Sequence, residues 1–360
     1  MLYIVYVDIN DASYLGIRKK VFAQIQVLQK YFGKVYYTTY CGQMMYLLLG
    51  DEVITKELAI TRQDCNNIIL KWIEEYSISR TYIRYNYSDK WFIEFLRQQK
   101  ERGIRSILEF PTVPYDGELR DKRLIVEDRF YREQLSQYLE QATTCSAHKE
   151  VFGIPSINLL NGVNIEQHPL RQLREKDNKI VLLAVASMAK WHGYERMIKG
   201  IAEYYANKGE REIVFKLVGE GPELEKYKKL ADKYKIQHNV EICGKLTGEK
   251  LTEQYNQTDL AVGSLGMYKI GLEQASPIKL SEYCARGIPF IYGYEDLGFN
   301  GTEDYLLKVP NDDSAINIRK VIDFYDRLGR DEECFYKMRK DAIERFSWES
   351  IFKPVVEYFK

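Results

Sequence analysis

Apolar and polar positions follow two patterns along this chain. Short, nearly continuous apolar runs predict buried strands, and longer stretches with apolar residues three or four apart predict amphipathic helices. In the first half, the runs expected to form strands are Leu2–Val7, Val35–Thr39, Met44–Leu49, Thr81–Tyr85, Ser106–Phe110, Thr143–Ser146 and Ser156–Leu160. The stretches expected to form helices there are Ile17–Phe32, Asn66–Tyr76, Trp91–Arg102 and Arg123–Ala142. Strands that alternate with helices predict a parallel sheet covered on both faces.

The pattern breaks and then restarts in the second half. The segment from Asn161 to Asp177 is polar and contains Pro169, which indicates an interdomain linker. The strands expected after it are Ile180–Ala186, Ile213–Val218, Val240–Cys243, Leu260–Val262 and Pro289–Tyr292; the helices are Tyr194–Tyr205, Glu223–Tyr234 and the tail from Asp312. The predicted fold class is therefore α/β, with two doubly wound Rossmann-like domains. In such sheets, ligands lie beyond the carboxyl ends of the strands.

Composition narrows the possible functions. Among 360 residues, 52 basic side chains balance 52 acidic ones, which argues against a general nucleic-acid binder. The six cysteines are far apart and only four histidines accompany them, so we expect no structural zinc site and free thiols in a reducing cytosol. The N-terminus has no signal-peptide pattern, and the longest apolar stretch is about half of the roughly 20 residues that a membrane helix needs. We expect a soluble, cytoplasmic protein.

Two loops of the first half could hold a ligand. In the loop Asp8–Gly16, Gly16 precedes a helix whose start favours an anion, although an ordinary turn would look the same. The basic residues Arg18, Lys19 and Lys20 that follow fit either a solvated helix face or contact with an anionic membrane surface. The second loop, Glu109–Glu118, has prolines and acids that could orient sugar hydroxyls or serve acid–base chemistry; alternatively, it is a rigid connector.

Two loops of the second half are better candidates. Lys190 and His192 lie between a buried strand and a helix, where a phosphate would sit. Lys279 and Glu282 are three residues apart, so they share one helix face near a start marked by Pro277. A surface ion pair would explain this spacing. We favour the alternative, in which the glutamate binds ribose hydroxyls while the lysine and the helix start bind phosphates.

Together these loops resemble the retaining glycosyltransferases of the GT-B fold, specifically glycosyltransferase family 4. The resemblance rests on Val185-Ala186-Ser187 with His192-Gly193, on Val218-Gly219-Glu220-Gly221-Pro222, on Val240-Glu241-Ile242-Cys243-Gly244, on Glu282–Pro289 and on the turn Asn161-Gly162-Val163. The versions Trp191–Tyr194 and Ser276–Tyr283 are similar to a subgroup of bacterial capsule and surface-polysaccharide pathways.

The resemblance implies an organisation and an activity. Residues 1–163 would form an acceptor-side domain on which a helix at 346–360 packs back, and residues 164–345 would form the nucleotide-sugar domain, with a cleft between the two. A nucleoside-diphosphate sugar, UDP favoured over GDP, would donate its sugar with retention to a hydroxyl of a saccharide or lipid-linked saccharide. Peripheral contact with the inner membrane surface is then possible, and neither a metal nor a cofactor is expected.

The resemblance also implies roles for residues. Lys190, Lys279 and Glu282 would be catalytic. The donor would be bound by Gly16, Ser187, His192, Gly219, Gly244, Ser276, Ile278, Lys279 and Glu282. The acceptor side would comprise Thr112, Tyr115, Asp116 and Glu118.

Departures from the family pattern keep one alternative open. Gln274 stands where the family has a first glutamate, and Ser187 and His192 replace an arginine and a lysine. These changes would suit a non-catalytic partner that stabilises another glycosyltransferase. A nucleotide-sugar epimerase would need carboxylate and histidine pairs that we do not find. A dinucleotide dehydrogenase is excluded because Asp8–Gly16 is not Gly-x-Gly-x-x-Gly.

Overall fold

The chain folds into two compact α/β units. A computed structural model describes residues 1–11, 14–113, 115–119, 121–328 and 330–360. Unit 1 comprises Met1–Asn161 and Trp348–Lys360, and unit 2 comprises Gly162–Ser347. These boundaries lie two residues from those inferred from the sequence. Ala12, Ser13 and Pro114, which belong to the two candidate loops of the first half, lie outside the described residues.

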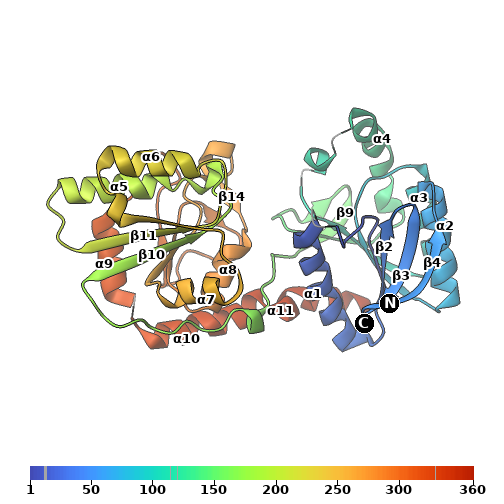
Figure 1. Cartoon of the computed structure of the whole chain (residues 1–360). Helices are drawn as coiled ribbons and strands as arrows, with labels where there is room; N and C mark the ends of the chain where they lie inside the picture. The colour runs from blue at the N-terminus through green and yellow to red at the C-terminus, as the bar shows by residue number, and fades with distance from the viewer. Residues whose placement is uncertain (12–13, 114, 120, 329) are drawn as a thin grey trace. The chain divides into compact units, whose positions relative to one another are not determined.

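Unit 1 is built on one mixed sheet (Figure 1). Its strands are β1 (Leu2–Ile4), β2 (Tyr36–Cys41), β3 (Met44–Leu49), β4 (Glu52–Leu58), β5 (Arg80–Arg84), β6 (Arg105–Phe110), β7 (Gln141–Thr144), β8 (Glu150–Val151) and β9 (Ile154–Asn158). Their order is β4-β3-β2-β1-β5-β6-β7-β9-β8, and all neighbours are parallel except the pairs that involve β3 and β8. Its helices are α1 (Leu15–Phe32), α2 (Arg62–Glu75), α3 (Lys90–Glu101), α4 (Lys122–Arg132) and α11 (Trp348–Phe359).

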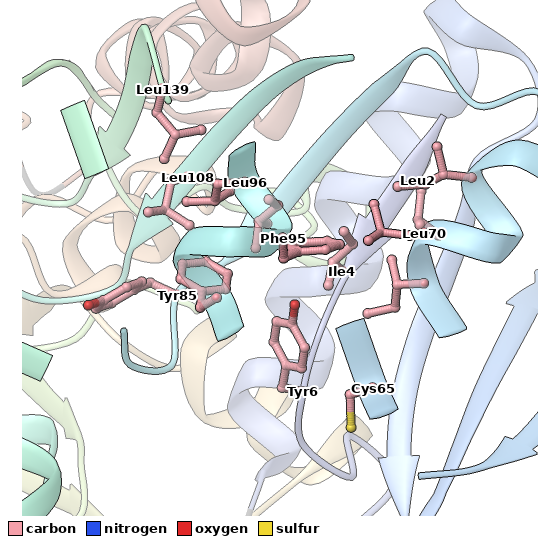
Figure 2. Close-up of a cluster of buried hydrophobic side chains, with 14 of the residues drawn as sticks. Leu2, Ile4, Tyr6, Cys65, Leu70, Tyr85, Phe95, Leu96, Leu108 and Leu139 are labelled. Carbon is pink, nitrogen blue, oxygen red and sulfur yellow. The ribbon is translucent and has the colours of Figure 1, made fainter. Parts of the chain in front are cut away.

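Alternation along β1 gives unit 1 a core on each face of the sheet. Leu2 and Ile4 point to one side, where they pack with apolar residues of α2 and α3, as Figure 2 shows for Leu70 and Phe95. Tyr3 points to the other side, toward α1 and the C-terminal helix α11, whose Phe352 is fully buried there. The C-terminal helix is therefore part of the core of unit 1.

Three local predictions for unit 1 were wrong. The strand β4 was not predicted, because Glu52–Leu58 is largely exposed at a sheet edge and lacks an apolar run. The helix predicted over Arg123–Ala142 ends at Arg132, and Ala142 lies in β7, between β6 and β9. The strand predicted over Leu2–Val7 stops at Ile4. β4 pairs with β3 across a two-residue turn, β7 pairs with β6 and β9, and the hydroxyl of Thr38 bonds the backbone of Val5 just after β1. Local apolar periodicity encodes none of these interactions.

Unit 2 carries a fully parallel sheet in the order β12-β11-β10-β13-β15-β17. Its strands are β10 (Lys179–Val185), β11 (Glu212–Val218), β12 (Val240–Gly244), β13 (Leu260–Val262), β15 (Phe290–Tyr292) and β17 (Leu306–Lys308), with a separate ladder of β14 (Gln274–Ala275) and β16 (Glu295–Asp296). Its helices are α5 (Glu195–Ala206), α6 (Leu224–Tyr234), α7 (Gly248–Asn256), α8 (Ile278–Ala285), α9 (Ile318–Leu328) and α10 (Glu332–Asp341).

Helices cover both faces of this second sheet. In Figure 1, α5 and α6 lie on one side of β10 and β11, and α7, α8 and α10 lie on the other. The predicted class, two doubly wound α/β domains, is therefore confirmed. The tail predicted to be helical from Asp312 becomes helical only at Ile318, and it is interrupted before α11 by a π-helical turn over Ala342–Phe346.

Candidate functional site

The strand order of unit 2 contains one topological switch point. The chain runs outward from the central strand β10 through β11 to β12, and then crosses to β13 on the other side of β10. At such a point the loops after the two adjacent strands diverge and leave a crevice at the carboxyl edge of the sheet. Those loops are residues 186–193 after β10 and residues 263–271 after β13. The predicted residues Ser187, Lys190 and His192 all lie in the first of them.

The two switch-point loops are hydrogen-bonded to each other. The amide of Leu265 donates to the carbonyl of His192 at 2.8 Å, and the amide of Gly266 donates to that of Trp191 at 3.1 Å. Gly193 has a left-handed φ of 61°, and a Cβ there would lie 2.7 Å from the nitrogen of Gly266. Only glycine fits such a close approach. Gly193 therefore lets the two loops meet, and this contact holds the preceding residue, His192, in place.

His192 is a buried, neutral imidazole in this arrangement. Its Nδ1 accepts a hydrogen bond from the amide of Ala189 at 3.0 Å. Its ring stacks on the ring of Tyr194, with 5.5 Å between the two ring centres. Burial, and after it the positive charge of Lys279, lower the pKa of His192 to about 3. Because Nδ1 accepts, Nε2 must carry the proton of the neutral ring, which makes it a hydrogen-bond donor near neutral pH.

Lys279 lies in the first turn of α8, and its amine is buried. Its Nζ has no hydrogen-bond partner among the residues that the structure describes. Burial lowers the pKa of Lys279 to about 7, against the attraction of Glu282, which favours the charged form. A buried amine without a partner is costly, and a bound anion is one group that could supply the missing partner.

Glu282 follows one turn later and is half-buried. Its Oε1 lies 3.8 Å from Nε2 of His168, which comes from the segment that precedes β10. Arg286, one further turn along, is buried with its guanidinium 4.2 Å from the ring centre of Tyr255, and its Nε and Nη1 have no partner in the described part of the chain. Burial lowers the pKa of Arg286 as well.

Sequence reasoning missed both His168 and Arg286 as members of this cluster. Arg286 was within reach, because it lies four residues after Glu282 and therefore on the same side of the helix. His168 offered no signal, since it is separated from Glu282 by more than a hundred residues of intervening chain.

The remaining predicted residues of unit 2 border the same edge. Gly219 follows β11, and its amide donates to the carbonyl of Gly244 at the end of β12 at 2.7 Å. A Cβ on Gly219 would lie 1.8 Å from the carbonyl oxygen of Ala186, so this turn rests on the loop after β10. Ser187 is exposed in that loop, Ser276 is half-buried just before α8, and Ile278 is exposed at its first residue.

Lys190 lies apart from this cluster. Its side chain is exposed and borders a hollow of about 470 Å³ that also involves Glu195, Lys226 and Lys269. Lys226 donates to Oε1 of Glu195 at 3.0 Å, and Lys269 bonds the same oxygen. No contact that the structure describes joins Lys190 to Lys279 or Glu282. His192, in contrast, is close enough to Lys279 for that charge to lower its pKa.

The predicted residues of unit 1 are largely bonded within the unit. Asp116 accepts from Arg129, and from Arg132 at 2.6 Å, and the hydrogen bonds from these arginines lower its pKa. Thr112 donates to Glu118, and the hydroxyl of the buried Tyr115 donates to the carbonyl of Asn86. Gly16 is exposed in the first turn of α1, with nothing within 4 Å of a Cβ built on it.

The basic triplet in α1 does not form one exposed patch. Nζ of Lys20 lies 2.8 Å from the buried Glu109, which also binds Arg84 at 3.1 Å. Burial by itself would raise the pKa of Glu109, but Lys20 and Arg84 outweigh burial and lower it to about 2. Lys20 therefore does not belong to the membrane-facing surface predicted on Arg18, Lys19 and Lys20, because it is paired with Glu109 inside the unit.

Two kinds of feature are absent from the described residues. No group of three or more His, Cys, Asp or Glu side chains among them is arranged to hold a metal ion. None of the described helices combines the length and apolarity needed to cross a bilayer.

Comparison with known proteins relates this site to one family. Residues 167–328 match the family model "Glycosyl transferases group 1". The matched segment contains β10, both switch-point loops and the whole of α8. A curated relative, an uncharacterized glycosyltransferase of Methanocaldococcus jannaschii, is 29% identical over 195 residues, which cover 53% of this chain. That alignment spans about half (47%) of the relative's own length.

Solved structures share the fold along the whole chain. A glycosyltransferase from Rickettsia africae matches with a TM-score of 0.67 at 14% identity, over 100% of this chain and 97% of its own. HepE of Anabaena, solved in complex with UDP, matches with a TM-score of 0.63 at 12% identity, over 99% of both chains. A sucrose-phosphate synthase from Thermosynechococcus elongatus matches with a TM-score of 0.61 at 13% identity, over 99% of this chain and 97% of its own. These likenesses agree with the predicted GT-B fold class.

Proposed function

We propose that this chain is a glycosyltransferase that uses a nucleoside-diphosphate sugar as donor. The observation that carries the proposal is the buried, unpartnered amine of Lys279, three residues before Glu282 and beside the neutral His192 at the switch point of unit 2. The family match includes every one of these residues. A diphosphate supplies the negative charge that a buried amine at a helix start lacks.

The side chains divide the work as follows. Lys279 and the first amides of α8 bind the diphosphate and neutralise the charge that grows on it as the sugar leaves. The Nε2–H group of His192 donates a hydrogen bond to the nucleotide sugar, and Glu282 accepts hydrogen bonds from the ribose hydroxyls. The hydroxyls of Ser187 and Ser276 donate further hydrogen bonds to the nucleotide sugar. Backbone near Gly219 and Gly244 borders the nucleoside. Lys190, in its separate hollow, is a second cation for incoming anions.

The donor base and the acceptor are proposed with support from the neighbours. HepE was solved with UDP, so we favour UDP over GDP as the leaving group. Another structure of this fold is a lipopolysaccharide outer core galactosyltransferase, with a TM-score of 0.58 and 13% identity, which supports a role in surface polysaccharide synthesis. We propose transfer with retention and without a metal, in the cytoplasm, to a saccharide or lipid-linked hydroxyl. The loop with Thr112, Tyr115, Asp116 and Glu118 serves the acceptor, and Gly16 borders the donor.

Thermal unfolding with UDP, GDP, ADP and CMP tests the donor class. A ligand that binds only the folded chain raises the midpoint, by about 2.7 kcal/mol of stability at a hundred times its Kd. We expect UDP to stabilise the wild type, and Lys279→Met and Glu282→Ala to remove that effect. Lys340→Met, a lysine whose side chain is 72% exposed on α10, is the matched control and should respond like the wild type.

Turnover then separates an enzyme from a non-catalytic partner. The wild type with a UDP-sugar and an acceptor glycan should release UDP, and the Glu282→Ala variant should not. If no nucleoside diphosphate moves the midpoint of the wild type, the proposed donor site is refuted. If UDP binds but is never released from a UDP-sugar, the chain is a binding partner and the catalytic part of the proposal fails.

A further inference from the structure

A groove in unit 1 lies between two neighbouring helices, along residues 63–70 of α2 and residues 90–98 of α3. β4 and β5 run in the same direction, so the helices that follow them both begin at the carboxyl edge of the sheet. The groove has a volume of about 380 Å³, which is within the range of small-ligand sites. The residues proposed to bind donor and acceptor belong to other segments of the chain.

Amide side chains are the commonest polar groups in the lining of this groove. Gln63, Asn66 and Asn67 come from α2, and Gln98 comes from α3. Each primary amide offers both a donor and an acceptor, which is the combination that binds sugar hydroxyls. The charged lining residues are one lysine, Lys90, and one glutamate, so the lining has no net charge that would select an ionic ligand.

Asn66 supplies an unsatisfied polar group on the buried side of the groove. It is 3% exposed, and its Oδ1 accepts from the hydroxyl of Tyr6 at 2.9 Å. Its Nδ2 has no partner among the described residues. Turning the amide over would only exchange the two atoms, because the single hydroxyl of Tyr6 bonds one of them. A buried amide left in this state costs about 1–3 kcal/mol until a ligand or water completes it.

Trp91, Glu94 and Phe95 also line the groove from α3. The indole of Trp91 is half-buried, and the ammonium of the exposed Lys90 lies 4.5 Å from the ring centre, which places a donor beside an apolar surface. Glu94 is held in one orientation by Arg97, at 2.6 Å and 2.8 Å, and by Gln98 at 2.9 Å. An aromatic ring next to fixed polar groups matches the two sides of a pyranose, one formed by C–H groups and one by hydroxyls.

We propose that this groove binds a neutral saccharide, with Trp91 against its apolar side and the amides of Asn66 and Asn67 on its hydroxyls. The inference goes beyond the proposed function, because a saccharide can be held here whether or not the chain transfers a sugar. In a working transferase, the groove would anchor a glycan away from the reacting hydroxyl.

Ligand-detected NMR titrations of the full chain test the groove. The probes are maltotetraose, cellotetraose and chitotetraose at millimolar concentration, without nucleotide. We expect at least one to bind, and Trp91→Ala and Asn67→Ala each to weaken it by about tenfold or more, the equivalent of 1.4 kcal/mol. Phe130→Ala, which removes an exposed ring of α4 in the same unit, is the control and should bind like the wild type.

The outcomes separate this proposal from the donor site. All variants are checked for an unchanged melting profile, and Asn67→Ala keeps the test valid if Trp91→Ala is unstable, because Asn67 is exposed. Trp91→Ala should retain its stabilisation by UDP. The saccharide proposal is overturned if no probe binds the wild type, if both groove variants bind as well as the wild type, or if binding is lost in Lys279→Met instead.

Discussion

The two units contain buried charged side chains in different states. In unit 1, Glu109 holds both Lys20 and Arg84, and Asp116 holds both Arg129 and Arg132, so these carboxylates have partners within the unit. In unit 2, the amine of Lys279 and two nitrogens of Arg286 are buried with no partner in the described part of the chain. A paired buried charge becomes costly only when its partner is removed, whereas an unpaired one is a candidate for binding a ligand. These two carboxylates of unit 1 are therefore structural, whereas the amine of Lys279 in unit 2 is where we propose that an anion binds.

Removing the carboxylate of Glu109 is the strongest test of the structural role assigned to the charges of unit 1. Glu109→Gln leaves Lys20 and Arg84 buried without a counter-charge, and we expect a loss of about 3–5 kcal/mol in the free energy of unfolding. Urea unfolding followed by circular dichroism measures it. Glu349→Gln is the control, because its pair with Lys30 is exposed and worth less than about 1 kcal/mol.

The low-pH side of the stability profile gives an independent check on Glu109. The pKa of Glu109 is about 2 in the folded chain and about 4.3 when unfolded, so its stabilisation is present above about pH 4.3 and is lost as the pH falls toward 2. The wild type should lose more stability over this window than Glu109→Gln does. Parallel profiles for the two proteins would contradict a structural role.

Lys279→Met should change the free energy of unfolding in the opposite direction to Glu109→Gln. Replacing an unpartnered buried amine with an apolar side chain of similar length should raise stability by about 1 kcal/mol while abolishing the response to UDP. The lowered pKa means that the folded chain binds this proton more weakly than the unfolded chain does. The penalty is therefore full below about pH 7 and declines toward the ordinary lysine pKa of about 10.4, and so does the gain from methionine.

Proton uptake sharpens the same prediction. A bound diphosphate favours the charged amine, so UDP should draw a proton onto Lys279 at about pH 8, above its pKa of about 7. Calorimetric titrations in buffers with different ionisation enthalpies measure this uptake. If Lys279→Met takes up as many protons as the wild type, or loses stability, the amine is not the unfilled anion site that the comparison requires.

Asp116→Asn should have the smallest effect. The pairs of Asp116 with Arg129 and Arg132 are partly exposed, so the loss of unfolding free energy should stay below about 1 kcal/mol. Affinity for UDP should not change. A fall in the apparent affinity for an acceptor glycan, measured in the transfer reaction at saturating donor, would show that this paired carboxylate also contacts a ligand and would weaken the contrast between the units.

How far the sequence reaches differs between the elements of the site. The register of α8 was predictable, because two polar residues three apart after a proline can share a face only in a helix that begins there, and Lys279 and Glu282 do so. The sequence predicted a loop at Gly193 but not the close contact that requires glycine there. That contact is with the backbone of Gly266, more than seventy residues later in the chain. Lys190 is only two residues from His192 in the sequence, yet it borders a different hollow.

Local sequence determined the alternation of strands and helices, and with it the doubly wound class and the edge at which ligands are expected, because apolar periodicity and turn residues act over a few positions. Tertiary structure decided which charges are satisfied. Lys20 was expected at a surface and Glu109 in a candidate ligand loop, yet they meet in the interior. His168 reaches Glu282 from the segment before β10. Whether a side chain has a partner depends on residues far away in the chain, and only the folded arrangement of strands brings them within bonding distance.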